Sequence, residues 1–261
     1  MKRTILTGIL ALATGFSCLM AQTAPPAKQG AAAQKGPAPK SQAEGQALND
    51  LFTAANAQNQ DGIIKAAEDL ISKFADTDFK EVALMLESQA YKAKGDTDKA
   101  QIYGERVLEI NPKSFQTTLM LGEILATHTR ENDLDKEEKL SKADKYLNGT
   151  IETLKTAPKP NPQIQDQQWE DAKKQLIAEA HNDLGLVALD RKKYDIAITE
   201  FKMAVDGDPQ ATFSVRLASA YQLAGKNTEA LEICDKLLAD PQLHPAIKGV
   251  ALQVKAAASK K

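Results

Sequence analysis

Aromatic residues and glycine are scarce in this chain, and both shortages favour helices over sheets. Phe, Trp and Tyr together make up 5% of the 261 residues, while Ala, Leu, Lys, Glu and Asp dominate. Ala, Leu, Lys and Glu form helices readily, whereas the scarce aromatic residues are enriched in strands. The formal net charge is only −2, so the composition indicates no strongly charged polymer as a partner.

Cysteine is almost absent as well. Cys18 and Cys234 are the only two, and the first lies in a segment that we expect to be removed from the mature protein. A single remaining cysteine excludes an intramolecular disulfide, so the fold must be held by packing alone. We expect Cys234 to be buried, because it occupies an apolar position in the repeat pattern described below.

The N-terminus has the pattern of a secretory signal peptide. Lys2 and Arg3 precede an uncharged, mostly apolar stretch over residues 5–20, and Ala21 offers a small residue for cleavage. A positive end, an apolar centre and a small residue are the three parts of an export signal. We therefore expect residues 1–21 to be removed and, for a bacterial source, the protein to be exported, either periplasmic or secreted.

Two membrane-bound alternatives remain open at this end. The uncharged stretch is short for a membrane-spanning helix, which needs about 20 residues. Lipidation of Cys18 would require a preceding Leu-Ala-Gly-like sequence, whereas Gly15, Phe16 and Ser17 stand there. We expect contact with a membrane only if the signal is uncleaved or Cys18 carries a lipid.

Residues 22–44 contain four prolines, two glycines and no large apolar side chain. Such a segment cannot bury enough surface to offset the entropy lost on ordering. The sequence therefore predicts a disordered tether here. A helical domain follows over residues 45–261, in which acidic side chains outnumber basic ones.

The clearest motif lies between Glu179 and Pro209. The motif consists of a Leu-Gly pair followed by an alanine, an aromatic residue, a second alanine and a proline, here Leu184-Gly185, Ala197, Phe201, Ala204 and Pro209. This spacing resembles the 34-residue tetratricopeptide repeat, which is a pair of antiparallel helices. A small residue in the first helix is expected to let the two backbones approach closely, with the alanine of the second helix opposite. A hairpin of this kind buries its apolar face only by stacking on its neighbours.

Poorer copies of the motif follow one another along the chain. Their glycines and prolines mark turns and helix ends, with Asp61-Gly62 expected to break the first repeat and Gly95 to make the turn of the second. A last helix with Ile247, Val250, Leu252 and Val254 is expected to cap the stack. The predicted repeats cover about 46–76, 81–114, 115–157, 178–210 and 211–245, with the cap at 246–258.

The junction between the third and fourth repeats departs most from this pattern. The alanine expected after Leu121-Gly122 arrives late, at Ala143, which indicates an insertion at about 128–142. This insertion is either a solvated extension or a functional loop. A proline-rich break over Ala157–Pro162 precedes an unusually long helix from about Gln165. We expect Trp169 in that helix to pack across the preceding hairpin, beside the insertion.

The resemblance to tetratricopeptide repeat proteins implies an all-α, right-handed superhelical solenoid of about five hairpins plus a capping helix. It also implies a concave groove that binds a peptide or protein segment rather than catalysis. The carboxylate-binding Lys/Asn/Arg set of some members is missing, since Arg216 stands alone. Transferred by register, the candidate groove residues are Met85, Gln89, Lys92, Leu119, Glu123, Asn182, Leu186, Asp190, Ser219 and Gln222.

Signals for catalysis are missing from the sequence. His128, His181 and His244 are far apart and have no partners at metal-ligand spacing, and we expect His181 to be a packing residue. No phosphate-binding glycine loop or nucleophile elbow occurs. Basic residues do not cluster with aromatics, which argues against nucleic acid. We expect no enzyme, metal or cofactor.

Two functional hypotheses remain. The first is an exported, non-enzymatic scaffold that binds a peptide or protein segment in its groove, a segment for which basic residues would suit the acidic side chains of the middle repeats. The second is a structural subunit of a cell-envelope assembly, in which residues 22–44 bridge to a membrane. The sequence does not identify the partner.

Overall fold

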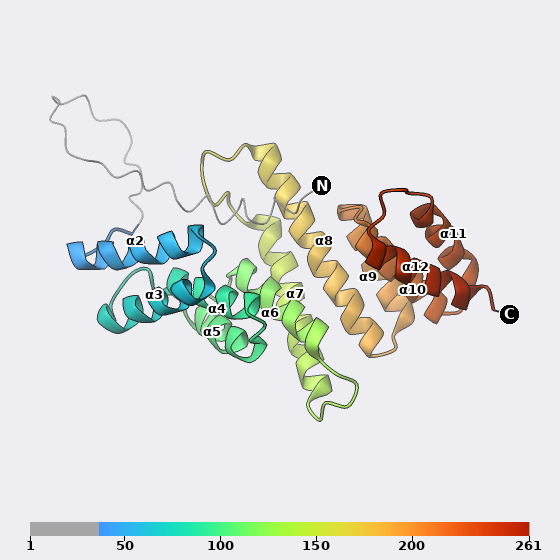
Figure 1. Ribbon diagram of the computed structural model, residues 1–261, viewed down its shortest axis with the longest axis horizontal. Helices are drawn as coiled ribbons and strands as arrows, with labels where there is room; N and C mark the ends of the chain where they lie inside the picture. Colours follow the sequence, from blue (N-terminus) through green and yellow to red (C-terminus); the bar gives the residue numbers. More distant parts are fainter. Residues whose placement is uncertain (1–36, 261) are drawn as a thin grey trace. The chain divides into compact units, whose positions relative to one another are not determined.

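The computed structural model describes residues 37–260 and contains eleven α-helices and no strand in that range (Figure 1). The predicted all-α fold is confirmed. The expected signal peptide and residues 22–36 lie outside the described residues. None of the helices described combines the length and the apolarity that crossing a bilayer requires.

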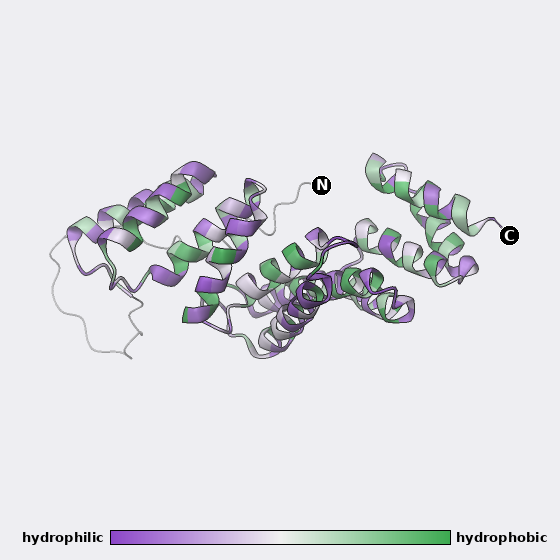
Figure 2. Cartoon of the chain, turned by 90° about the horizontal axis from the view of Figure 1, so that it is seen from below, coloured by the Kyte–Doolittle hydropathy of each residue, from purple (hydrophilic) through white to green (hydrophobic). Residues whose placement is uncertain are grey.

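The helices form five successive pairs and one closing helix, labelled here as in Figure 1. Each helix carries hydrophobic and hydrophilic residues (Figure 2), as expected for amphipathic helices that bury one face. The bounds are α2 (Gln42–Asn56), α3 (Gln60–Lys73), α4 (Lys80–Ala93), α5 (Thr97–Ile110), α6 (Phe115–His128), α7 (Lys136–Thr156), α8 (Asp166–Asp190), α9 (Tyr194–Gly207), α10 (Ala211–Leu223), α11 (Asn227–Leu238) and α12 (Pro245–Ala258).

The chain forms two compact units. The N-terminal unit contains α2 to α5, and the C-terminal unit contains α6 to α12. Within each unit, neighbouring helices pack in chain order. This arrangement is the stacking that lets each hairpin bury an apolar face it could not bury alone.

The first helix begins at Gln42, three residues before the domain boundary expected from the sequence. Ser41 caps it, because its hydroxyl accepts a hydrogen bond of 3.1 Å from the backbone N–H of Glu44. The Glu44 carboxylate is buried and accepts 2.6 Å from the Thr77 hydroxyl. Residues 41–44 form an S-x-x-E capping sequence, so regular structure reaches into the segment predicted as tether.

The break in the first hairpin lies at residues 57–59, and the prediction of a break at Asp61-Gly62 is wrong. Asn59 caps α3 by accepting 3.0 Å from the backbone N–H of Gly62, which places that glycine in the first turn of the helix. Gly62 also lies against α2, where an added Cβ would be 3.2 Å from that of Ala54. The glycine therefore serves close helix packing and not the turn.

The small residues of the first helices face a large side chain. A Cβ added to Gly122 would lie 2.5 Å from Leu147, and one added to Gly185 would lie 2.5 Å from the Phe201 ring. The side chain nearest to the small residue is therefore this large one, and the placement of the motif alanine opposite the small residue stays a prediction. The facing residue comes one turn after the alanine, on the same side of the second helix. Gly95 has φ of +80°, as predicted for a turn glycine.

Trp169 packs across the preceding hairpin, as predicted, but at its other end. It is buried, its Nε1 donates 3.1 Å to the carbonyl oxygen of Ala157, and its ring lies 6.2 Å from that of Phe115. Phe115 begins α6 and Ala157 follows α7, whereas the insertion joins the opposite ends of these helices. The prediction that Trp169 lies beside the insertion is therefore wrong.

The closing helix α12 packs on α10 and α11 and caps the C-terminal unit. Val254 is buried and Ile247 is half-buried, but Val250 and Leu252 are 41% and 51% exposed, contrary to the predicted apolar face. Small residues, Ala251 and Ala258 among them, complete the buried face. Cys234 is buried in the core of the same unit, as predicted.

Candidate functional site

The candidate groove residues all lie on the first helix of a repeat. Met85, Gln89 and Lys92 belong to α4 in the N-terminal unit, and the other seven belong to α6, α8 and α10 in the C-terminal unit. Leu119 and Asn182 are buried, and the remaining eight are half-buried. We call the side of the C-terminal unit formed by α6, α8 and α10 the inner-helix face.

A buried polar cluster lies on this face around Asn182. The residue is 4% exposed, its Nδ2 donates 2.9 Å to Asp183 Oδ1, and its Oδ1 accepts 2.7 Å from Arg216 Nη1. Asn182 therefore links α8 to α10. Because both ends of its amide are hydrogen-bonded, Asn182 orients the Asp183 carboxylate and the Arg216 guanidinium.

Asp183 is the most perturbed acid of the cluster. It is 6% exposed, and burial raises its pKa to about 7, with the negative charge of Glu123 on α6 acting in the same direction. Arg216 opposes this rise, while burial lowers the pKa of its own guanidinium. The cluster thus brings together charged groups from three successive first helices in a partly dehydrated setting.

Asp183 is not among the residues selected by register, and Arg216 was set aside as a lone cation. Both residues directly precede the small-residue pair of their repeats, Leu184-Gly185 and Leu217-Ala218. An acid and a base at the same register position of adjacent repeats is a signal that the sequence does contain. It predicts that the two side chains lie near each other once the repeats stack.

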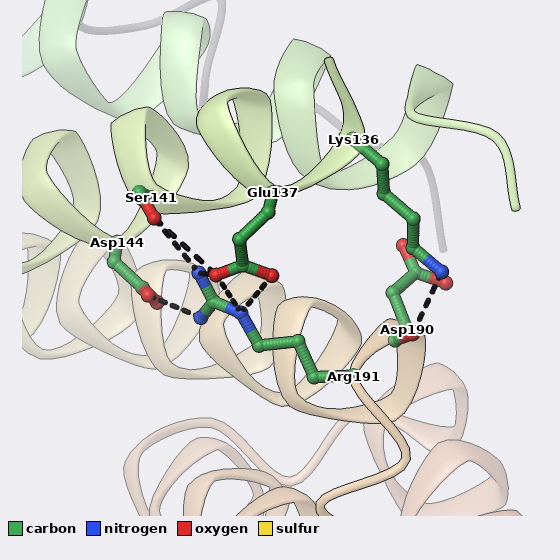
Figure 3. Close-up of polar contacts among 6 residues, drawn as sticks. All are labelled: Lys136, Glu137, Ser141, Asp144, Asp190 and Arg191. Carbon is green, nitrogen blue, oxygen red and sulfur yellow. Dashed lines mark hydrogen bonds and ion pairs between the residues drawn. The ribbon is translucent and has the colours of Figure 1, made fainter. Parts of the chain in front are cut away.

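The insertion is held to the following repeat by Arg191 at the end of α8. Its Nε donates 2.9 and 3.1 Å to the two carboxylate oxygens of Glu137, and its Nη2 donates 3.2 Å to Ser141 Oγ. Its Nη1 pairs with Asp144. Figure 3 shows the guanidinium reaching from α8 to three successive turns of α7.

Lysines on both sides complete this contact. Lys136 Nζ donates 2.9 Å to the carbonyl oxygen of Asp190 (Figure 3) and also pairs with Glu131. Lys192 Nζ lies 3.1 Å from the same Glu131 carboxylate. Since α7 begins with the inserted residues, these bonds fasten the insertion to the turn after α8. The insertion is therefore integrated into the stack and is more than a solvated extension.

A polar cleft of about 380 Å³ opens beside these bonds. Three cations and two acids line it, namely Lys136, Arg191, Lys193, Glu137 and Asp190. Asp190 is a candidate groove residue, and burial raises the pKa of its carboxyl. Lys136 is already bonded to Asp190 at the end of α8, and Arg191 is bonded to Glu137 and Asp144 on α7. We therefore interpret the cleft as part of the contact that holds α7 to α8.

The N-terminal unit contains an acid without a hydrogen-bond partner. Glu87 on α4 is 0% exposed, and neither of its carboxylate oxygens has a partner among the described residues. Burial raises its pKa to about 7, the charge of Glu68 adds to the rise, and Tyr103 and Arg106 oppose it. A buried acid of this kind costs stability whenever it is ionised.

The histidines belong to no metal-binding group in the described part of the chain. His181 Nδ1 lies 2.8 Å from Glu200 Oε2, which joins α8 to α9 and agrees with a packing role. This carboxylate comes 19 residues later in the chain, so no local spacing in the sequence indicates the pair. Within residues 37–260, no group of three His, Cys, Asp or Glu side chains could hold a metal ion.

The hairpins, their order and their packing define a helical-repeat protein. Two tetratricopeptide repeat profiles match the sequence, one over residues 167–212 and 182–244 and the other over residues 82–114. The chain is a tetratricopeptide repeat protein. Comparison with curated protein sequences gives no significant match.

Solved structures of the same fold agree. A thermophilic tetratricopeptide repeat protein of Thermus thermophilus is 18% identical, with coverage of 82% of this chain and 98% of the other and a TM-score of 0.52. PilW, a type IV pilus biogenesis factor, is 17% identical, with 84% and 90% coverage and a TM-score of 0.56. MamA of AMB-1 is 18% identical, with 80% and 97% coverage and a TM-score of 0.55.

Proposed function

We propose that this protein is a non-enzymatic scaffold that binds a peptide or protein segment on the first helices of its repeats. The observation that carries the proposal is the half-buried row of mixed side chains over α6, α8 and α10, which surrounds the Asn182 cluster. Half-buried apolar and polar groups side by side suit a partner that contributes both packing and hydrogen bonds. The fold class supports protein partners in general.

The charge of the inner-helix face favours a segment with basic residues. Glu123 and Asp183 belong to this face, and Arg216 is the cation that opposes the charge of Asp183. Asp190, at the end of α8, lies in the cleft with the three cations instead. Complementary charge increases the rate of encounter and selects against acidic partners. An extended or helical segment with lysine or arginine side chains therefore fits the face best.

We further propose that the protein acts in an exported compartment. The support is the signal-like pattern of residues 1–21, with Lys2 and Arg3 before an apolar stretch. The similarity of fold to PilW, described as a type IV pilus biogenesis factor, favours a second candidate function. In that function the repeats are a structural subunit of a cell-envelope assembly.

Site-specific photocrosslinking in cells tests the binding proposal. A photoreactive residue is placed at Leu186 or Gln222 on the inner-helix face, and at exposed Ile196 on α9 as the matched control. We expect a discrete protein adduct from the first two positions and not from the third. Equal capture from all three positions, or from the control alone, would refute the assigned face.

Fractionation distinguishes the two candidate functions. A scaffold that exchanges partners should yield adducts that decline when the partner is depleted, while the protein itself stays in the soluble fraction. A structural subunit should instead sediment with membranes in every growth condition and release the same set of proteins on extraction.

A further inference from the structure

Glu87 occupies a leucine position in the second repeat. Counted back from the motif alanine of the second helix, it stands where Leu184 and Leu217 stand in later repeats. Those leucines are buried, and Glu87 is buried as well, with 0% exposure and no hydrogen-bond partner for either carboxylate oxygen among the described residues. A neutral carboxyl is tolerated in such a position, whereas an ionised one loses its hydration without replacement.

Ionisation of Glu87 would affect the two neighbouring helices in opposite ways. Glu68 on α3 disfavours the ionised form, and Tyr103 and Arg106 on α5 favour it. A negative charge on Glu87 is therefore repelled across the contact between α3 and α4 and attracted across the contact between α4 and α5. The attraction is not sufficient, because burial is the largest influence on the pKa of this carboxyl and raises it.

The contact between α4 and α5 is also fastened by specific interactions. Ser88 Oγ donates a buried hydrogen bond of 2.6 Å to the carbonyl oxygen of Ala100. The Tyr91 ring on α4 stacks on the Tyr103 ring on α5, with 5.2 Å between the two centroids. Neither interaction requires a protonated Glu87, so the second hairpin stays together when this residue ionises.

The contact between α3 and α4 depends more on apolar packing. Leu70 of α3 and Ala83 and Leu86 of α4 belong to one buried cluster. Lys94, just after α4, pairs with Asp61 of α3, but both side chains are exposed, and an exposed ion pair contributes little. Water that enters to hydrate a charge on α4 should therefore separate α3 from α4 before it separates α4 from α5.

We propose that Glu87 makes the attachment of the first hairpin, α2 and α3, sensitive to pH. The protonated residue allows α3 to pack on α4, whereas the ionised carboxylate repels Glu68 and draws water into this contact. Because a single hairpin cannot bury its apolar face alone, a detached α2 and α3 should unfold locally while the rest of the chain stays folded. This inference does not depend on the proposed binding function.

The pKa of Glu87 gives the direction of the pH effect. With the hairpin attached this pKa is about 7, and with the carboxyl hydrated it returns towards 4.5. Because the attached form has the higher pKa, attachment is strongest below pH 4.5, weakens as pH rises and levels off above pH 7. Each unit of pKa difference is a tenfold change, so the detached fraction should rise about ten- to seventyfold from pH 5 to pH 8.

Hydrogen exchange of the full chain, followed by mass spectrometry of its peptides, tests the proposal. Exchange is compared at pH 5 and pH 8, with the times scaled for the pH dependence of the intrinsic exchange rate. Glu87→Gln keeps the shape of the side chain and removes its charge. Glu109→Gln removes an exposed charge from α5 and is the matched control.

We expect peptides from α2 and α3 of the wild type to exchange about ten- to seventyfold faster at pH 8, after scaling, and peptides from α5 and α8 to keep their protection. The pH dependence should be lost in Glu87→Gln and kept in Glu109→Gln. The comparison within the wild type needs no variant to fold.

Equal scaled exchange of α2 and α3 at the two pH values would overturn the inference. A loss of protection that α5 shares equally would do so too, because the whole N-terminal unit would then be opening. Persistence of the pH dependence in Glu87→Gln would assign it to another group. Crosslinking from Leu186 and Gln222, both in the C-terminal unit, judges the proposed function separately.

Discussion

Replacing Glu87 by Gln should stabilise the protein at pH 8 and leave its stability nearly unchanged at pH 4. Glu87 is fully buried, and neither of its oxygens has a hydrogen-bond partner among residues 37–260. Its pKa rises from 4.5 to about 7 on folding. In the unfolded chain the group ionises from about pH 4.5 upwards, so folding at higher pH must either bind a proton or bury a charge.

The sign and size of the effect follow from this rise in pKa. Because the folded pKa is the higher one, the stability is greatest below pH 4.5 and falls as pH rises towards 7, above which the loss is constant. A tenfold change in the acid dissociation constant corresponds to about 1.4 kcal/mol of free energy. Relaxation of the protein around the charge reduces the free-energy cost of ionised Glu87. We therefore expect Glu87→Gln to raise the free energy of unfolding by about 1–3 kcal/mol at pH 8.

The measurement is urea unfolding followed by far-UV circular dichroism at pH 4 and pH 8. The exposed Glu109 on α5 provides the matched control, since Glu109→Gln removes the same charge from the same unit. Trp169, the only tryptophan, lies in the C-terminal unit, so its fluorescence serves as an internal reference for that unit. A gain that is equal at both pH values, or one shared by Glu109→Gln, would refute the reasoning.

Two further substitutions test the packing of the C-terminal unit. Gly185→Ala places a methyl group 2.5 Å from the Phe201 ring and should cost about 1–3 kcal/mol by thermal denaturation, whereas Gly149→Ala has open space and should be neutral or stabilising. Equal melting temperatures for the two would show that the hairpin is not close-packed there. Arg191→Ala should speed proteolysis within residues 129–142, and Lys174→Ala, at an exposed lysine earlier on α8, should not. Unchanged cleavage in Arg191→Ala would mean that the insertion is held by other contacts.

The order of the hairpins could be predicted because the signals that mark them are local. Leu184-Gly185, Gly95 and the proline-rich break after Ala157 each act within a few residues, and the structure places turns and helix ends accordingly. The prediction was wrong at the first hairpin, where a helix-capping signal at Asn59 competed with a turn signal at Asp61-Gly62. Asn59 caps α3 and so takes Gly62 into the helix, although a glycine after an aspartate resembles a turn.

The candidate site was less predictable, because it depends on contacts between repeats. Register alone selected Asn182, which is one residue and about 100° of helix from Asp183. Both residues are buried, and the cluster that they form depends on the link from Asn182 to Arg216, which lies 34 residues away. Likewise, the α12 residues Val250 and Leu252 are apolar but point away from the stack, since small residues fill its buried face.

The bonds of Arg191 to α7 mean that the third hairpin cannot be shortened by itself. Deleting the inserted turns to restore a repeat of ordinary length would take away Glu137 and leave a largely buried guanidinium without this partner. Insertion and arginine therefore form one structural module, in which a change in either requires a change in the other. An engineered repeat swap at this junction should exchange α7 and the turn after α8 together.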